Sequence, residues 1–181
     1  VIKGVGYSPA PAYTFPSQFG WCEYCPAGNS WCAYPDKNND GYVCASDGAP
    51  ANVFDRSDVD LDRDFQLLND MHINTIRTWD PVTEKLLEAA SAHELKVIAG
   101  FRIDPATKYA DDATRQNILN KFEQYVKNVS TFKNSKNVDV ILFWNIGNEN
   151  NLYVEEDLVD DMYSLFNEMA EKAHAAEGSS Y

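Results

Sequence analysis

Hydrophobic residues along this chain follow two alternating patterns, one typical of buried strands and one typical of amphipathic helices. Short apolar runs that end at polar, glycine or proline residues predict strands over 1–7, 73–79, 96–101 and 138–144. After each of these strands, apolar residues recur every three or four positions, which predicts helices over 57–71, 83–93, 112–129 and 155–176. The chain therefore consists of four strand–helix units in succession.

This strict alternation predicts an α/β fold with a parallel sheet covered by helices. The two main solutions are a doubly wound sheet and a (β/α)8 TIM barrel. A doubly wound nucleotide-binding sheet predicts a glycine-rich phosphate loop directly after the first strand, and this chain has none there. A barrel instead carries its chemistry where the strands end. Polar and aromatic residues gather at the predicted strand ends: Tyr7, Arg77, Trp79, Asp80, Arg102, Asp104, Asn148 and Glu149. We therefore expect a barrel.

The number of units is half of what that fold requires. A complete barrel has eight strands and about 250 residues, whereas the 181 residues given contain four units. An isolated half barrel would expose two sheet edges. We therefore expect residues 1–181 to form a single, partial barrel domain, completed by further sequence of the same protein or by another chain.

The first strand is followed by an unusually long connection, residues 9–56, which contains all four cysteines. Their clustering among glycine, proline and asparagine residues indicates disulfides formed in an oxidising compartment. The spacing of Cys22 and Cys25 also suits zinc, but Cys32 and Cys44 do not form a second such pair. Zinc and free thiols stay open as alternatives, and the sequence does not select among the three pairings.

A second pattern in this connection resembles a calcium-binding loop. Asp36, Asn38, Asp40 and Asp47 take liganding positions, with Gly41 at the sixth. The last position is usually Glu, and no pair of predicted helices flanks the segment. A bound structural calcium and a polar turn are both compatible with these residues.

Composition and charge narrow the classes of partner. The formal net charge is −13, which argues against nucleic acid because phosphates require a basic surface. No apolar run approaches the roughly 20 residues of a membrane span. A neutral partner such as a polysaccharide or oligosaccharide is compatible with this charge. The sequence Asn128-Val-Ser130 is a glycosylation sequon, and with the cysteines it favours a secreted glycoprotein whose N-terminus is already processed or begins an excised piece.

The residues after the fourth strand are suited to acid catalysis. Asn148 and Glu149 follow a buried strand and a glycine that lets a substrate approach. Glycoside cleavage requires two carboxyl groups, one of which protonates the leaving oxygen. Phe143 and Trp144 are candidates for the apolar surroundings that raise the pKa of such an acid. An equally simple interpretation is that Asn148 and Glu149 cap the following helix.

Three segments in order resemble the clan A glycoside hydrolases, which are retaining barrel enzymes. These are Ile2-Lys-Gly-Val-Gly-Tyr-Ser-Pro9, Asn74-Thr-Ile-Arg-Thr-Trp79 and Leu142-Phe-Trp-Asn-Ile-Gly-Asn-Glu-Asn150. Leu95-Lys-Val-Ile-Ala-Gly100 resembles the third strand of the same enzymes. The resemblance covers most of the chain except the cysteine-rich connection.

The resemblance implies a role for each matching residue. Glu149 would be the acid/base, Asn148 would hold the sugar 2-hydroxyl, Arg77 would orient the nucleophile, and Trp79 or Tyr7 would line the subsite. The nucleophile of the family is a glutamate on strand seven, which this chain does not contain.

From the residues alone, Arg77 also suits a structural ion pair. Tyr7, Trp79 and Trp144 suit either stacking on sugar rings or packing.

We therefore expect a secreted, extracellular or cell-wall enzyme that cleaves or transfers β-linked polysaccharide and needs no cofactor for catalysis. The alternative from another class is a structural or carbohydrate-binding protein built on a similar barrel that does not catalyse.

Overall fold

The main sheet of the protein is parallel throughout. The computed structural model describes residues 1–7, 60–104, 107–152 and 154–178, and the backbone of three short strands at 14–17, 20–24 and 42–43. The main sheet has the order β1-β5-β6-β7, and every neighbouring pair is parallel. Its strands are β1 (Gly4–Gly6), β5 (Thr75–Arg77), β6 (Lys96–Phe101) and β7 (Ile141–Ile146). The predicted α/β class with a parallel sheet is confirmed.

Helices follow the strands as the periodicity predicts. They are α1 (Leu61–Asp70), α2 (Glu84–Ala92), α3 (Asp112–Lys136) and α4 (Val159–Glu177), with short 3-10 turns η3 (Asn150–Leu152) and η4 (Glu156–Leu158) before α4. Asp60, Thr83 and Asp111 cap the first three helices, because each side chain accepts a hydrogen bond from a backbone N–H in the first turn. Such caps satisfy donors that have no partner within the helix.

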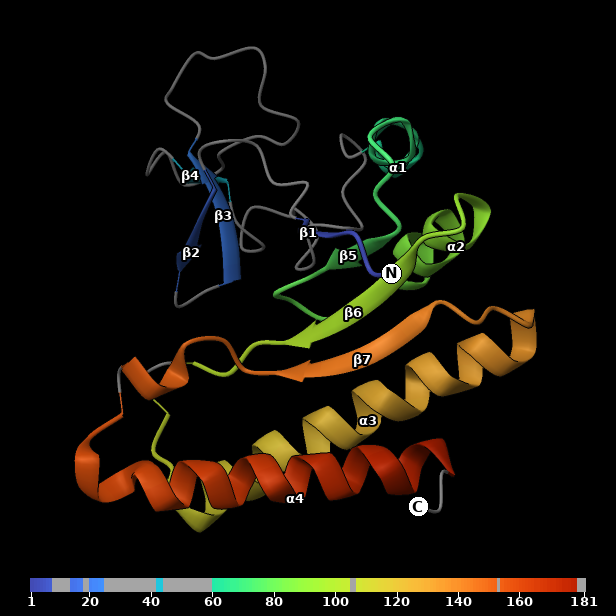
Figure 1. Ribbon diagram of the computed structural model, residues 1–181. Coiled ribbons are helices and arrows are strands. Elements are labelled where there is room, and N and C mark those ends of the chain that lie inside the picture. The colour runs from blue at the N-terminus through green and yellow to red at the C-terminus, as the bar shows by residue number, and fades with distance from the viewer. Residues whose placement is uncertain are drawn as a thin grey trace.

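The described helices pack on one face of this sheet (Figure 1). Val97 and Ala99 of β6 belong to the core that α2 covers. Phe101, on the same face of β6, contacts Phe122 of α3 with ring centroids 5.0 Å apart. The opposite face is more open, and Phe143 of β7 is 55% exposed there. In the described part of the chain, the sheet therefore has a single helix-covered face, which is compatible with a barrel wall.

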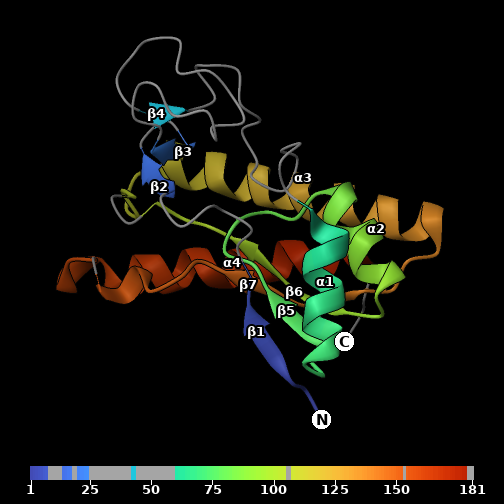
Figure 2. The ribbon, with the colours of Figure 1, turned by 90° about the horizontal axis from the view of Figure 1, so that it is seen from above.

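A second, smaller sheet lies within the long connection that was expected to be a loop. It has the antiparallel order β2-β3-β4, formed by Thr14–Ser17, Gly20–Tyr24 and Tyr42–Val43. Its pairs include Phe15 with Cys22 and Tyr24 with Tyr42. Aromatic residues favour such strands, which explains why this connection contains regular structure. Figures 1 and 2 place these strands toward the end of the molecule where β6 and β7 end.

The predicted disulfides and calcium site remain predictions. Cys22 is described by its backbone alone, and its three companions lie outside the described residues. The four calcium candidates, Asp36, Asn38, Asp40 and Asp47, also lie outside them. Among the helices that the structure describes, none is both long and apolar enough to cross a bilayer.

Candidate active site

One hydrogen bond joins the ends of β5 and β7. The Arg77 Nη2 donates to Asn148 Oδ1 at 2.8 Å. The Arg77 guanidinium carbon also lies 5.3 Å from the centroid of the Trp79 ring, which is within the range of a cation–π contact. The structure therefore brings three of the predicted site residues together, from segments 71 residues apart.

Glu149 lies in a tight turn directly after β7. Gly147 and Glu149 have positive φ values of 71° and 55°. The turn is held from both sides, because Gly147 N donates to the Phe101 carbonyl at 2.8 Å and Leu152 N donates to the Glu149 carbonyl at 3.0 Å. A non-glycine residue with positive φ is uncommon, and such residues are enriched at functional sites. The Glu149 side chain is exposed, so its carboxylate is accessible from solvent.

Asn150 holds this turn in place by hydrogen bonds. The sequence did not predict this role. Asn150 is 3% exposed. Its Oδ1 accepts a hydrogen bond from Asn148 N at 2.8 Å, and its Nδ2 donates to the Ile103 carbonyl at 3.1 Å and to Tyr109 Oη at 3.0 Å. A buried amide with partners on both atoms fixes backbone geometry. The only signal in the sequence is its place in Gly147-Asn-Glu-Asn150, which does not reveal its burial.

Two glycines on the strands that flank β5 make room for Thr78 and Trp79. A Cβ on Gly6 would lie 2.4 Å from Trp79 Cη2, and a Cβ on Gly100 would lie 2.3 Å from the Thr78 carbonyl oxygen. Buried Thr78 completes the arrangement, since its Oγ1 accepts from Gly100 N and donates to the Asp80 carbonyl, both at 3.0 Å. Close packing of β1, β5 and β6 therefore positions Trp79 beside Arg77.

Of two other predicted site residues, Tyr7 is buried in the core and Trp144 is partly buried and packs against it. Tyr7 is 8% exposed, its ring meets Phe65 of α1 edge-on with centroids 5.2 Å apart, and its hydroxyl donates to Asp64 Oδ2 at 2.9 Å. Burial and this hydrogen bond raise the pKa of Tyr7 well above its usual value. Trp144 meets Tyr125 of α3 edge-on, with centroids 5.5 Å apart. For Tyr7 and Trp144 the structure therefore shows packing rather than exposed stacking surfaces.

The apolar surroundings expected for Glu149 are divided between the two faces of the sheet. Trp144 packs in the core of β7, α3 and α4, whereas Phe143 points away from it and is exposed. The two aromatic residues therefore do not form one apolar wall around the carboxylate.

The sequon residue Asn128 is exposed on α3, where its Oδ1 accepts from Gln124 Nε2 at 2.7 Å. Ser130, the third residue of the sequon, has a buried Oγ with no hydrogen-bond partner within the described structure. Glycosylation of Asn128 remains a prediction.

Neither a scan against protein-family models nor a search of curated proteins gives a match for this chain. The resemblance to clan A glycoside hydrolases therefore rests on the sequence motifs alone.

Proposed function

We propose that this chain forms part of the barrel of a secreted, retaining glycoside hydrolase or transglycosylase that acts on β-linked extracellular or cell-wall polysaccharide. Glu149 is its general acid/base. The observation that carries the proposal is the hydrogen bond between Arg77 and Asn148 at the ends of β5 and β7. It joins the second-strand and fourth-strand motifs in one place, beside an accessible glutamate.

The hydrogen bond also determines how Asn148 is oriented. An arginine side chain carries only donors, so the atom that it contacts must be the amide oxygen. This leaves Asn148 Nδ2 as the donor that holds a substrate hydroxyl. A hydrogen bond to the sugar 2-hydroxyl strengthens in the transition state of glycoside cleavage and lowers its free energy.

Glu149 acts twice in the proposed reaction. In the first step it gives its proton to the glycosidic oxygen while a second carboxylate attacks the anomeric carbon and forms a covalent glycosyl-enzyme. In the second step the Glu149 carboxylate takes a proton from water, or from a sugar hydroxyl in a transfer reaction, as that oxygen attacks the anomeric carbon. The second carboxylate is then released unchanged.

The proposal expects the second carboxylate outside the four described units. In retaining enzymes the two carboxyl groups lie roughly 5–5.5 Å apart. The proposal places the second on a later strand of an eight-stranded barrel, of which β1, β5, β6 and β7 are the first four. The single helix-covered face of the main sheet supports this placement, because a barrel carries its helices on the outside alone.

One observation favours the alternative, a carbohydrate-binding or structural protein that does not catalyse. A general acid that works at neutral pH is usually enclosed by apolar groups, whereas the Glu149 side chain is exposed and Trp144 is packed in the core. Even without catalysis, the Arg77–Trp79 stack offers a surface on which a sugar ring can bind.

Turnover by the full-length protein separates the two functions. We expect cleavage of aryl β-glycosides or β-glucans, and loss of that activity in Glu149→Gln. Glu155→Gln is the matched control, because Glu155 is exposed nearby in sequence and its side chain makes no capping hydrogen bond. A native mass well above 20.4 kDa would show that further strands are available. Binding of β-glucan without turnover would support the alternative and refute the enzyme.

A further inference from the structure

Tyrosines aside, three described residues with polar side chains are buried, and they are Thr75, Thr78 and Asn150. Asn150 is the one that follows the proposed acid directly. Its amide uses both of its polar atoms, accepting from Asn148 N and donating to the Ile103 carbonyl and Tyr109 Oη. The amide therefore connects the turn after β7 with the segment that follows β6.

The contact between Asn150 and the turn is close. A Cβ on Gly147 would lie 2.4 Å from Asn150 Oδ1, so the amide fits only beneath a glycine with positive φ. By holding the N–H of Asn148, Asn150 fixes the peptide between Gly147 and Asn148. The orientation of this peptide sets the direction in which Asn148 and Glu149 leave the strand.

Tyr109 supports Asn150 in turn. It is 1% exposed, and its hydroxyl oxygen accepts from Asn150 Nδ2 at 3.0 Å. Burial raises the pKa of the Tyr109 phenol, which keeps the hydroxyl neutral. The backbone of Tyr109 is held as well, because its carbonyl accepts from Arg115 Nη1 at 3.2 Å.

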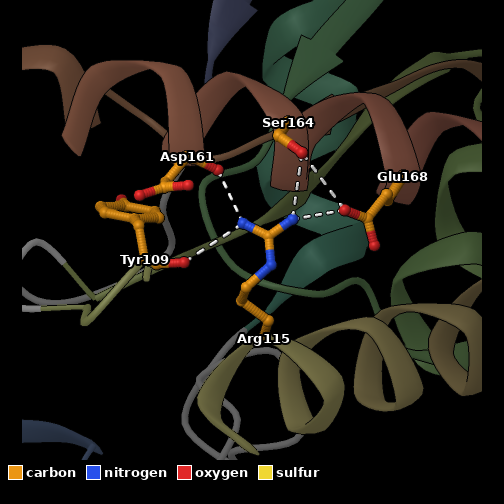
Figure 3. Close-up of polar contacts among 5 residues, drawn as sticks. All are labelled: Tyr109, Arg115, Asp161, Ser164 and Glu168. Carbon is orange, nitrogen blue, oxygen red and sulfur yellow. Dashed lines mark hydrogen bonds and ion pairs between the residues drawn. The ribbon is translucent and has the colours of Figure 1, made fainter. Parts of the chain in front are cut away.

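Arg115 ties Tyr109 to the helices α3 and α4 (Figure 3). Its Nη1 also donates to the Asp161 carbonyl at 2.8 Å, and its Nη2 donates to Ser164 Oγ at 3.2 Å and pairs with the Glu168 carboxylate. The Arg115 side chain is only 14% exposed. One guanidinium therefore links Asp161, Ser164 and Glu168 of α4 to the segment that carries Tyr109.

We infer that Asn150 and Tyr109 are positioning residues for Asn148 and Glu149, and that Arg115 anchors them to the α3–α4 pair. This inference rests on the proposed function, because the orientation of Glu149 affects a rate only if Glu149 acts on a substrate. The hydrogen-bond network itself can be tested by a measurement that needs no substrate.

The first test uses hydrogen exchange on the full-length protein. Tyr109→Phe removes the hydroxyl that accepts from Asn150 and keeps the ring. Tyr125→Phe is the matched control, since the hydroxyl of Tyr125 on α3 also accepts a hydrogen bond, in this case from the backbone N–H of Val82 at 2.9 Å. We expect exchange at the Asn148 N–H to accelerate about fivefold in Tyr109→Phe, comparable to the loss of one neutral hydrogen bond, and to stay unchanged in Tyr125→Phe. Arg115→Lys should accelerate it in the same direction.

The second test uses kinetics, with each rate expressed per folded molecule. Tyr109→Phe should lower kcat about fivefold and leave KM within about twofold, because a positioning residue affects the transition state more than binding. Tyr125→Phe should change neither. Unchanged exchange at Asn148 in both Tyr109→Phe and Arg115→Lys, or equal kcat in the two tyrosine variants, would overturn the inference. If hydrogen exchange changes as expected but the unaltered protein shows no turnover, the positioning network is supported and the proposed function is refuted.

Discussion

Arg77 and Asn148 are 71 residues apart in the chain, and their side chains meet at 2.8 Å where β5 and β7 end. Parallel strands with a common direction bring such ends to the same edge of the sheet, which is where barrels and open α/β sheets carry their sites. Because Arg77 is also within cation–π range of Trp79, its guanidinium links the Asn148 amide to an aromatic ring.

Replacement of Arg77 by lysine should reduce activity. Lysine offers a flexible point charge instead of a planar group that can stack on Trp79 and donate to Asn148 at the same time. We expect kcat/KM of Arg77→Lys to fall about tenfold, since one charge-assisted hydrogen bond is weakened. Arg63→Lys is the control, because Arg63 is an exposed residue of α1 that pairs with Asp64. Equal activity of the two variants would contradict a role for Arg77 in the site.

Replacement of Gly147 by alanine should destabilise the turn that carries Glu149. The new Cβ would meet Asn150 Oδ1 at 2.4 Å, and the backbone φ is 71°. Gly178→Ala provides the matched control, because Gly178 has φ 70° but, its chain neighbours and own helix backbone aside, no atom of the described residues lies within 4 Å of the new Cβ. Denaturant unfolding should show a loss of about 1 kcal/mol for Gly178→Ala from the backbone alone. The loss for Gly147→Ala should be greater by about 1–3 kcal/mol, and similar losses would argue against the close contact.

Replacement of Gly6 by alanine tests the packing around Trp79. Its Cβ would lie 2.4 Å from Trp79 Cη2, whereas for alanine at Gly4 on the same strand the nearest atom among the described residues is the Thr75 carbonyl oxygen, at 3.4 Å from the Cβ. We expect Gly6→Ala to lower the free energy of unfolding by about 1–3 kcal/mol and Gly4→Ala to have a much smaller effect. Chemical denaturation measures both, and a smaller effect at Gly6 would show that Trp79 does not lie over β1.

The stability of the α3–α4 pair should decline at acidic pH, because Glu123 becomes protonated there. Hydrogen bonds from Lys127 and Lys172 lower the pKa of Glu123 from 4.5 to about 2. A carboxyl group with a lowered folded-state pKa stabilises the protein above its unfolded pKa, and this contribution is lost as pH falls through the folded value. Glu123→Gln should therefore reduce stability at neutral pH and flatten its decline between about pH 4.5 and 2. Thermal unfolding across this window tests it, with Glu84→Gln as control, and parallel curves for Glu123→Gln and the unaltered protein would contradict it.

Much of the fold could be predicted from local pattern alone. The predicted strand 96–101 coincides with β6 (Lys96–Phe101), and the predicted helix 83–93 matches α2 (Glu84–Ala92) to within a residue at each end. Thr83 explains the accuracy at α2, because an N-cap residue marks a helix start in the sequence as well as in the structure. Where a cap or a breaker is local, the pattern determines the boundary.

Boundaries set by tertiary contacts were predicted less well. The helix predicted to end at residue 129 continues to Lys136, because Phe132 stays buried one turn further on, and it stops where Asn137 adopts φ 54°. The strand predicted over 138–144 begins instead at Ile141 and ends at Ile146. Its register against β6 shifts between Val97 and Ile98, and a sequence pattern does not encode such a shift.

In the candidate site, too, local sequence predicts some residues and only tertiary contacts reveal the others. Motif position placed Arg77, Trp79, Asn148 and Glu149 at the strand ends, and the structure shows Arg77 in contact with Trp79 and Asn148. The support beneath them was not predictable, because Asn150, Tyr109 and Arg115 lie in three different segments and share no spacing. Their roles depend on burial and on contacts between helices, which only the folded chain reveals.

The central claim, that Glu149 is the general acid, is tested most directly by the dependence of rate on the leaving group. In Glu149→Gln, kcat/KM for a poor leaving group such as an alkyl alcohol should fall about 10²–10⁴-fold, the usual contribution of general acid catalysis. For dinitrophenolate, which needs no proton, the fall should be far smaller, and Glu155→Gln should change neither rate. Equal losses for both leaving groups in Glu149→Gln, or no loss at all, would contradict the claim.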